Sequence, residues 1–131
     1  MSIQVELSEL AGAMAKYPFA YLLTTSDQGP PHALAVVPQV DGALLRVIRA
    51  GRRTLANAQA HPQVSLVWPP ASVDHYSLIV DGRAEAEGET LRIQPTRAVL
   101  HRPAARGSAA AEGTCTSDCV RIPLTGSAPT R

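Results

Sequence analysis

The sequence of 131 residues is poor in aromatic side chains and nearly free of lysine. Aromatic residues make up 4% of the chain, so valine, leucine, isoleucine and alanine have to build the core. Lys16 is the single lysine among 12 basic residues, and the others are arginine. Arginine suits bidentate contacts with phosphate or carboxylate. A GC-rich genome is the alternative explanation of this bias.

Several classes of protein are excluded by what the chain lacks. The net charge of +1 argues against a nucleic-acid binder. No apolar run approaches the ~20 residues of a membrane span. The range Met1–Leu10 carries Glu6 and Glu9 and no basic residue, so it does not read as a secretory signal. Two cysteines, Cys115 and Cys119, are too few for a disulfide framework. We therefore expect a cytoplasmic protein without a nucleic-acid or membrane partner.

The first half of the chain predicts one helix and three strands. Leucine, alanine and methionine at helical spacing predict a helix over Glu6–Lys16, which Pro18 ends. Turn residues separate the segments that follow. We expect these segments to form an antiparallel meander of strands Phe19–Thr25, Pro31–Val40 and Ala43–Arg49, with a two-residue turn at Asp41-Gly42 and with Pro38 at an edge or bulge.

The second half predicts a short helix and three more strands. Thr54–His61 contains good helix formers, and Thr54 is a plausible N-cap. Asp81-Gly82 predicts a bulge and Gly88 a tight turn. Trp68 is expected in the core or at a dimer interface, with stacking on a bound small molecule as the alternative. The predicted strands are Gln63–Trp68, Tyr76–Ala86 and Thr90–His101, the last of them interrupted by Pro95.

These elements indicate a mainly β fold. Six short, bent, antiparallel strands with one or two short helices fit a small closed or nearly closed barrel. We assign residues 1–102 to this domain. Residues 103–131 are rich in alanine, glycine, serine and proline, which is typical of a tail. The sequence leaves three alternatives open for its Cys115 and Cys119. They have no catalytic role, they have a redox or disulfide role, or they bind a metal with His75 or His101.

One stretch could bind an anion. Arg49-Ala50-Gly51-Arg52-Arg53-Thr54-Leu55-Ala56-Asn57 joins a strand end, a glycine turn, two arginines and a helix start. A helix N-terminus offers unpaired N–H groups and a positive dipole end. Neighbouring guanidinium groups make it a natural phosphate site. The alternative is a capped helix with two solvated arginines.

Around this stretch, the sequence resembles the pyridoxamine 5′-phosphate oxidase-like, FMN-binding split-barrel family. The resemblance covers about 84 residues, Phe19–Arg102. It is carried by the order and spacing of these runs: FAYLLTTSDQGPPHALAVVPQV, LLRVIRAGRRTLAN, AHPQVSLVW, YSLIVDGRAEAEG and LRIQPTRAVLHR.

The resemblance implies a six-stranded split-barrel homodimer with FMN at the subunit interface and a small-molecule substrate. By position, Arg52, Arg53 and Thr54 would face the phosphate, with Asn57 one turn on and Arg49 as a further candidate. The backbone of Ala35, Val36 and Val37 would run along the isoalloxazine ring, near His32. No catalytic residue and no metal ligand is assigned.

The chain departs from the full oxidases. Their arginine and lysine of the second strand fall here near Leu34 and Gln39, and their C-terminal substrate segment has no match. We therefore expect a flavin-dependent oxidoreductase that acts on another small molecule. The alternatives are a protein that binds haem or a deazaflavin, a sensor without turnover, and an interaction module without a ligand.

Overall fold

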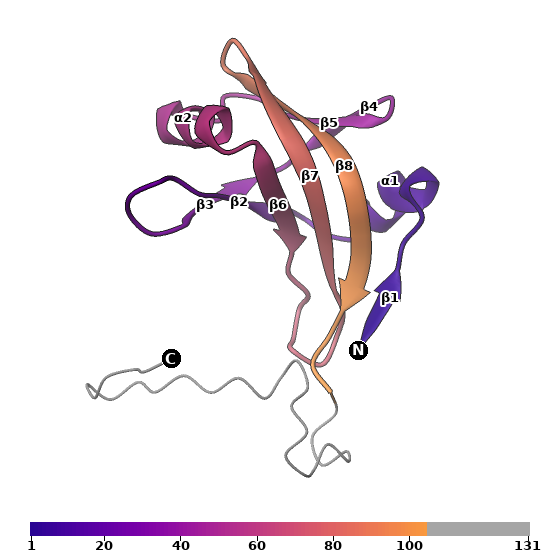
Figure 1. The fold of residues 1–131 in the computed structure, drawn as a ribbon. Coiled ribbons are helices and arrows are strands. Elements are labelled where there is room, and N and C mark those ends of the chain that lie inside the picture. Colours follow the sequence, from indigo (N-terminus) through magenta and orange to yellow (C-terminus); the bar gives the residue numbers. More distant parts are fainter. Residues whose placement is uncertain (105–131) are drawn as a thin grey trace, which may run out of the picture.

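The structure, a computed structural model, describes residues 1–104 as one curled antiparallel sheet with short helices beside it (Figure 1). The strands are β1 (Ser2–Gln4), β2 (Ala20–Thr24), β3 (His32–Val36), β4 (Gln39–Asp41), β5 (Leu44–Val47), β6 (Gln63–Trp68), β7 (Ser77–Glu87) and β8 (Thr90–His101). The helices are η1 (Leu7–Glu9), α1 (Leu10–Met14) and α2 (Arg52–Ala60). The predicted mainly β barrel is confirmed, with eight strands rather than six.

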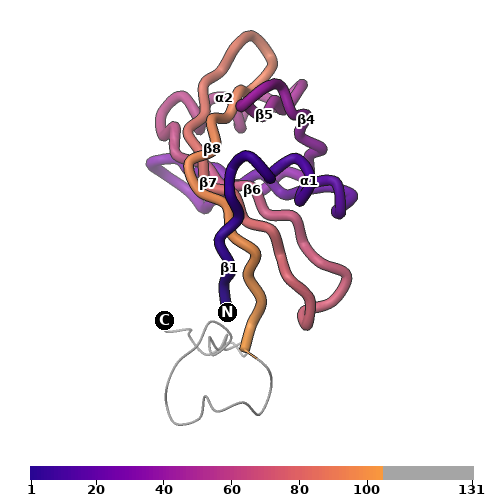
Figure 2. The backbone as a smooth tube through the Cα atoms, turned by 90° about the vertical axis from the view of Figure 1, so that its right-hand side faces the viewer, coloured from indigo at the N-terminus to yellow at the C-terminus, as the bar shows by residue number. Residues whose placement is uncertain are grey.

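The strand order is β3-β2-β6-β7-β8-β5-β4, and β1 pairs with β8. Figures 1 and 2 both show β1 beside the last part of β8. The predicted meander is wrong, because β3 and β4 follow each other in the chain yet lie at opposite ends of the sheet. Val37 and Pro38 separate them, since proline has no N–H to donate to a ladder. The predicted strand Pro31–Val40 is therefore two strands.

The N-terminal helix is shorter than predicted. Only η1 and α1 are helical, and Ser2–Gln4 is a strand that the sequence did not indicate. Gly12 lowers the helix propensity of this segment. The backbone N–H of Val5 donates to the carbonyl of Ala98 at 2.8 Å, so β8 continues to hold the chain in an extended form. Helix formation therefore starts only after Val5.

The helix α2 begins two residues earlier than predicted. Its N-cap is Gly51, which lies at φ 92° and makes no side-chain capping hydrogen bond. The prediction of Thr54 as the N-cap is wrong, because the left-handed turn at Gly51 already starts the helix. Thr54 lies in the first turn of α2 and is 1% exposed.

The long hairpin β7–β8 bends at the predicted bulge. The register shifts between Asp81 and Gly82, and Gly82 lies opposite Pro95. Only glycine fits there, because a Cβ on Gly82 would lie 2.7 Å from Cγ2 of Ile93. The predicted interruption at Pro95 is wrong: β8 runs through it, since a bulge tolerates the missing N–H of proline. The predicted turn at Gly88 is confirmed, with φ 63°.

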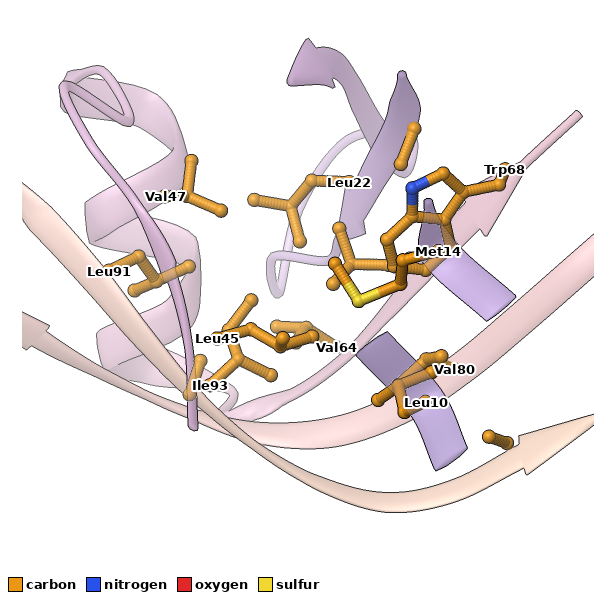
Figure 3. Packing of buried hydrophobic residues seen from close by; sticks show 14 of the residues in the cluster. Leu10, Met14, Leu22, Leu45, Val47, Val64, Trp68, Val80, Leu91 and Ile93 are labelled. Atoms are coloured by element: carbon orange, nitrogen blue, oxygen red, sulfur yellow. The ribbon is translucent and has the colours of Figure 1, made fainter. Parts of the chain in front are cut away.

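The core lies on the concave side of the sheet. The strand β6 has its predicted bounds, and Val64, Leu66 and Trp68 are buried on one face. Trp68 packs near Met14 of α1 (Figure 3), which confirms its place in the core. The same alternation buries Leu78 and Val80 of β7, and the core is otherwise built from leucine, valine, isoleucine and alanine.

The predicted tail of residues 103–131 falls, from residue 105 on, outside the described residues, as do Cys115 and Cys119. None of the helices in residues 1–104 has the length and apolar character of a membrane span.

Candidate functional site

The turn from β5 into α2 has unusual backbone geometry. Arg49 lies at φ 57° and Gly51 at φ 92°, and Arg49 is the non-glycine residue with a left-handed conformation in residues 1–104. A single hydrogen bond from the Ala50 N–H to the carbonyl of Glu89, at 3.0 Å, ties this turn to the β7–β8 hairpin. The turn therefore presents the N-terminus of α2 to solvent beside the start of β8.

A hollow of about 360 Å³ opens at this N-terminus. Arg49, Gly51, Arg52, Leu55 and Glu89 line it. Two guanidinium groups and the positive end of the helix dipole outweigh the single carboxylate of Glu89 in the hollow, so the electrostatic potential there favours an anion. In residues 1–104, no ion pair within 4.0 Å joins either arginine to Glu89. Both guanidinium groups are therefore available to a ligand.

The other predicted phosphate contacts lie differently. Arg53 is exposed on α2 but does not line this hollow. Thr54 is 1% exposed and Asn57 is 7% exposed. The Asn57 side chain donates from Nδ2 to Oγ1 of Thr24 on β2 at 3.0 Å. This bond occupies the Asn57 side chain inside the protein, where it attaches α2 to the sheet.

The predicted ring-facing residues lie on β3, the strand at one end of the sheet. Ala35 is exposed, Val36 is half-buried against the core, and Val37 is 70% exposed just after the strand. The strand pairs with β2 along one edge, as in the register Tyr21↔Ala35. Its other edge has no partner strand in residues 1–104. The structure does not bring these residues into the hollow at α2.

Two lining residues of the hollow escaped the sequence prediction. Leu55 follows Thr54 on α2, and Glu89 lies in the β7–β8 turn. Glu89 reaches the site because β5 pairs with β8 in the register Val47↔Leu91. This pairing joins segments more than 40 residues apart, and no local motif indicated it.

The histidines do not form a site together. Nε2 of His61 lies 2.7 Å from Oδ1 of Asp27, and Nδ1 of His101 lies 2.8 Å from Oγ of Ser2. His32 is half-buried on β3 and His75 is exposed in the β6–β7 loop. No three His, Cys, Asp or Glu side chains gather as metal ligands in the part of the chain that the structure describes.

Comparison with known proteins links the chain to two mycobacterial proteins. They are uncharacterized protein Mb0449c of Mycobacterium bovis and uncharacterized protein MT0457 of Mycobacterium tuberculosis. Each is 42% identical over an alignment of 133 positions, gaps included, that covers 89% of this chain and 94% of the relative. The chain belongs to their family. No protein-family model matches the sequence.

Solved structures share the fold at low sequence identity. An FAD-binding protein of Mesorhizobium loti superposes with a TM-score of 0.59 at 15% identity, over 76% of this chain and 96% of that one. A candidate pyridoxamine 5′-phosphate oxidase of Listeria innocua gives 0.58 at 14%, over 72% and 96%. The FAD-binding protein of Mycobacterium smegmatis gives 0.57 at 19%, over 78% and 100%. The split-barrel fold expected from the sequence is thereby supported.

Proposed function

We propose that this protein binds a flavin nucleotide, FMN, and is a flavin-dependent oxidoreductase acting on a small molecule. The hollow at the N-terminus of α2 is the observation that carries this proposal. Arg49 and Arg52 line it, Arg53 lies beside it, and the first N–H groups of α2 have no side-chain cap from Gly51. A phosphate group satisfies such N–H donors and both guanidinium groups together.

The residues present fit this cofactor. Arg49, Arg52 and Arg53 would hold the phosphate, and Thr54 and Asn57 would position the helix from within. The free edge of β3 leaves backbone groups of Ala35–Val37 for the polar rim of a ring, and the small side chain of Ala35 leaves space for it. When bound, a flavin supplies the hydride chemistry, so the chain itself needs to supply position and charge.

The partner we propose is a second copy of this chain, with the flavin at the interface. The convex face of the sheet carries a row of apolar side chains, which the register places side by side: Ala35, Tyr21, Val67 and Ile79. Tyr21 is 41% exposed, with its ring 5.3 Å from that of Phe19. An apolar row of this kind favours burial against another subunit.

The test is a titration of FMN into the full chain and into the double variant R52A/R53A. We expect the wild-type chain to bind FMN and the variant to lose at least about tenfold in affinity. The charge-assisted contact of Arg52, which lines the hollow, is worth about 1.5–3 kcal/mol and accounts for that loss, and the exposed Arg53 beside it adds to the positive potential. A control removes the same charge elsewhere, in the exposed Arg83 and Arg97 (R83A/R97A); Arg97 also gives up its exposed ion pair with Asp81, which is worth little.

Equal FMN affinity of the R52A/R53A variant and the control would overturn the phosphate site. Circular dichroism should show the same strand content for all three proteins, because the four arginines are exposed.

A protein that binds a different cofactor without turnover is the second candidate. Solved structures with this fold include an F420 reductase, with a TM-score of 0.54, and a heme storage protein of Vibrio cholerae, with 0.50. The absence of basic residues at Leu34 and Gln39 favours a cofactor other than FMN. Oxidation of NADH or NADPH in the presence of FMN separates the candidates, since the binding protein shows none.

A further inference from the structure

A second hollow lies at the other end of the barrel, where α1 meets the start of β2 and the β6–β7 loop. Its volume is about 660 Å³, within the range of small-molecule sites. Three of the five aromatic residues of the chain line it: Tyr17, Phe19 and Tyr76. Prolines, among them Pro70, complete the wall. A chain so poor in aromatic residues thus gathers most of them at one place.

The aromatic wall is held in position by contacts of its own. Oη of Tyr17 donates to the carbonyl of Tyr76 at 2.9 Å, and burial raises the pKa of Tyr17, so this donor keeps its proton. The guanidinium carbon of Arg102 lies 4.6 Å from the centre of the Tyr76 ring. Such a preformed wall lowers the entropy that a ligand loses on binding.

The charge around this hollow is positive. Lys16, the single lysine of the chain, lines it together with His75, and no carboxylate side chain does. Within the described range, 1–104, no ion pair joins Lys16 to an acidic side chain. An anionic group on a ligand would therefore meet a free ammonium group at the rim.

This hollow is distinct from the one at α2. Tyr76 precedes β7, and Glu89 follows its end. The 11 residues of β7 separate the two, which is up to roughly 35 Å along an extended strand. The two hollows share no lining residue and lie at opposite ends of β7.

We propose that the hollow between α1 and the β6–β7 loop is a binding site for a planar aromatic acid. The rings of Tyr17, Phe19 and Tyr76 stack with or pack edge-on against the aromatic part. Lys16 pairs with the acidic group at the rim. This inference goes beyond the proposed flavin site and does not depend on it.

The test uses anilinonaphthalene sulfonate, a fluorescent aromatic anion, and phenylnaphthylamine, its uncharged counterpart, with the full chain. We expect one saturable sulfonate site per chain. Lys16→Ala should lower the affinity for the sulfonate about three- to fivefold, the effect of one exposed ion pair, and leave the affinity for the uncharged probe unchanged. Arg83→Ala removes one exposed charge outside the hollow and is the matched control.

A second variant places a charge in the hollow without touching the core. Ala71 is exposed and lines the hollow, so Ala71→Glu should leave the fold intact. Its carboxylate should lower the affinity for the sulfonate, because the two negative charges repel each other. Both probes should retain their affinity in the R52A/R53A double variant, whatever that variant does to FMN.

Three results would overturn the proposal. One is no saturable sulfonate binding. Another is binding that Lys16→Ala and Ala71→Glu change no more than Arg83→Ala does. The third is stoichiometric displacement of the sulfonate by FMN, which would make the hollow part of the flavin site.

Discussion

At the scale of single residues, two buried positions decide how the candidate site is held. Asn57 joins α2 to β2 through its hydrogen bond to Thr24, and both side chains are almost fully buried. Gly82 allows the paired strands β7 and β8 to approach closely at their bulge, where a Cβ would meet Ile93 and the carbonyl oxygen of Gln94. Neither residue contacts the hollow at α2, yet each fixes an element that forms it.

We expect Asn57→Ala to lower the free energy of unfolding by about 1–3 kcal/mol, because it leaves the buried hydroxyl of Thr24 without this donor. Chemical denaturation followed by circular dichroism measures the change. Gln59→Ala is the control, since Gln59 is exposed on the same helix and its loss should cost less than about 0.5 kcal/mol. If Asn57→Ala also lowered the free energy of unfolding by less than about 0.5 kcal/mol, this would contradict the structural role of the bond to Thr24.

Gly82→Ala should destabilise the protein by about 1–3 kcal/mol, since the added methyl group overlaps backbone that cannot move freely. Gly12→Ala is the matched substitution: no atom lies within 4 Å of the added Cβ, and alanine favours the helix α1. It should leave the melting temperature unchanged or raise it. Equal effects of the two substitutions on the melting temperature would show that the close approach at Gly82 is not tight.

At the scale of elements, local signals were enough for some segments and misleading for others. The strand β6 has its predicted bounds because its alternation is regular and Pro62 and Pro69 bound it. The bulge at Asp81-Gly82 also followed from sequence. In contrast, β1 forms because it pairs with β8, which is distant in sequence. The separation of β3 from β4 arises because β3 pairs with β2 and β4 with β5, at opposite ends of the sheet.

The candidate site shows the same division. Arg49 and Arg52 were found from a local motif, and the structure places both around one hollow. Thr54 and Asn57 were chosen for their position in the same motif, but burial directs them to the interior. Glu89 could not be found, because only the β5–β8 pairing brings it to the turn.

The turn between β5 and α2 gives a prediction at this scale. Gly51 lies at φ 92°, so Gly51→Ala is strained and should destabilise the turn by about 1 kcal/mol or more, even though space for the methyl group is free. We expect a weaker affinity for FMN than the small loss of stability alone explains, because the N–H groups of α2 move. Unchanged FMN affinity would argue against their role; isothermal titration calorimetry measures it.

At the scale of the whole molecule, the proposed dimer depends on the convex apolar row of the sheet. Tyr21→Asp places a charge in this row, on an exposed side chain that the core does not need. We expect the variant to sediment as a monomer and to retain less FMN, since the proposed flavin site is completed by the second copy. Analytical ultracentrifugation measures the association.

The matched control is Val73→Asp, which places the same charge on a 75% exposed side chain in the β6–β7 loop. It should leave the association state unchanged. A wild-type chain that sediments as a monomer at all concentrations would contradict the proposed interface.

We propose above all that this split barrel binds a flavin at the N-terminus of α2. The most direct measurement is the absorption spectrum of the purified full chain after addition of FMN and gel filtration. We expect flavin bands that travel with the protein and disappear in the R52A/R53A variant. A spectrum without flavin bands, before and after the addition of FMN, would contradict the proposal.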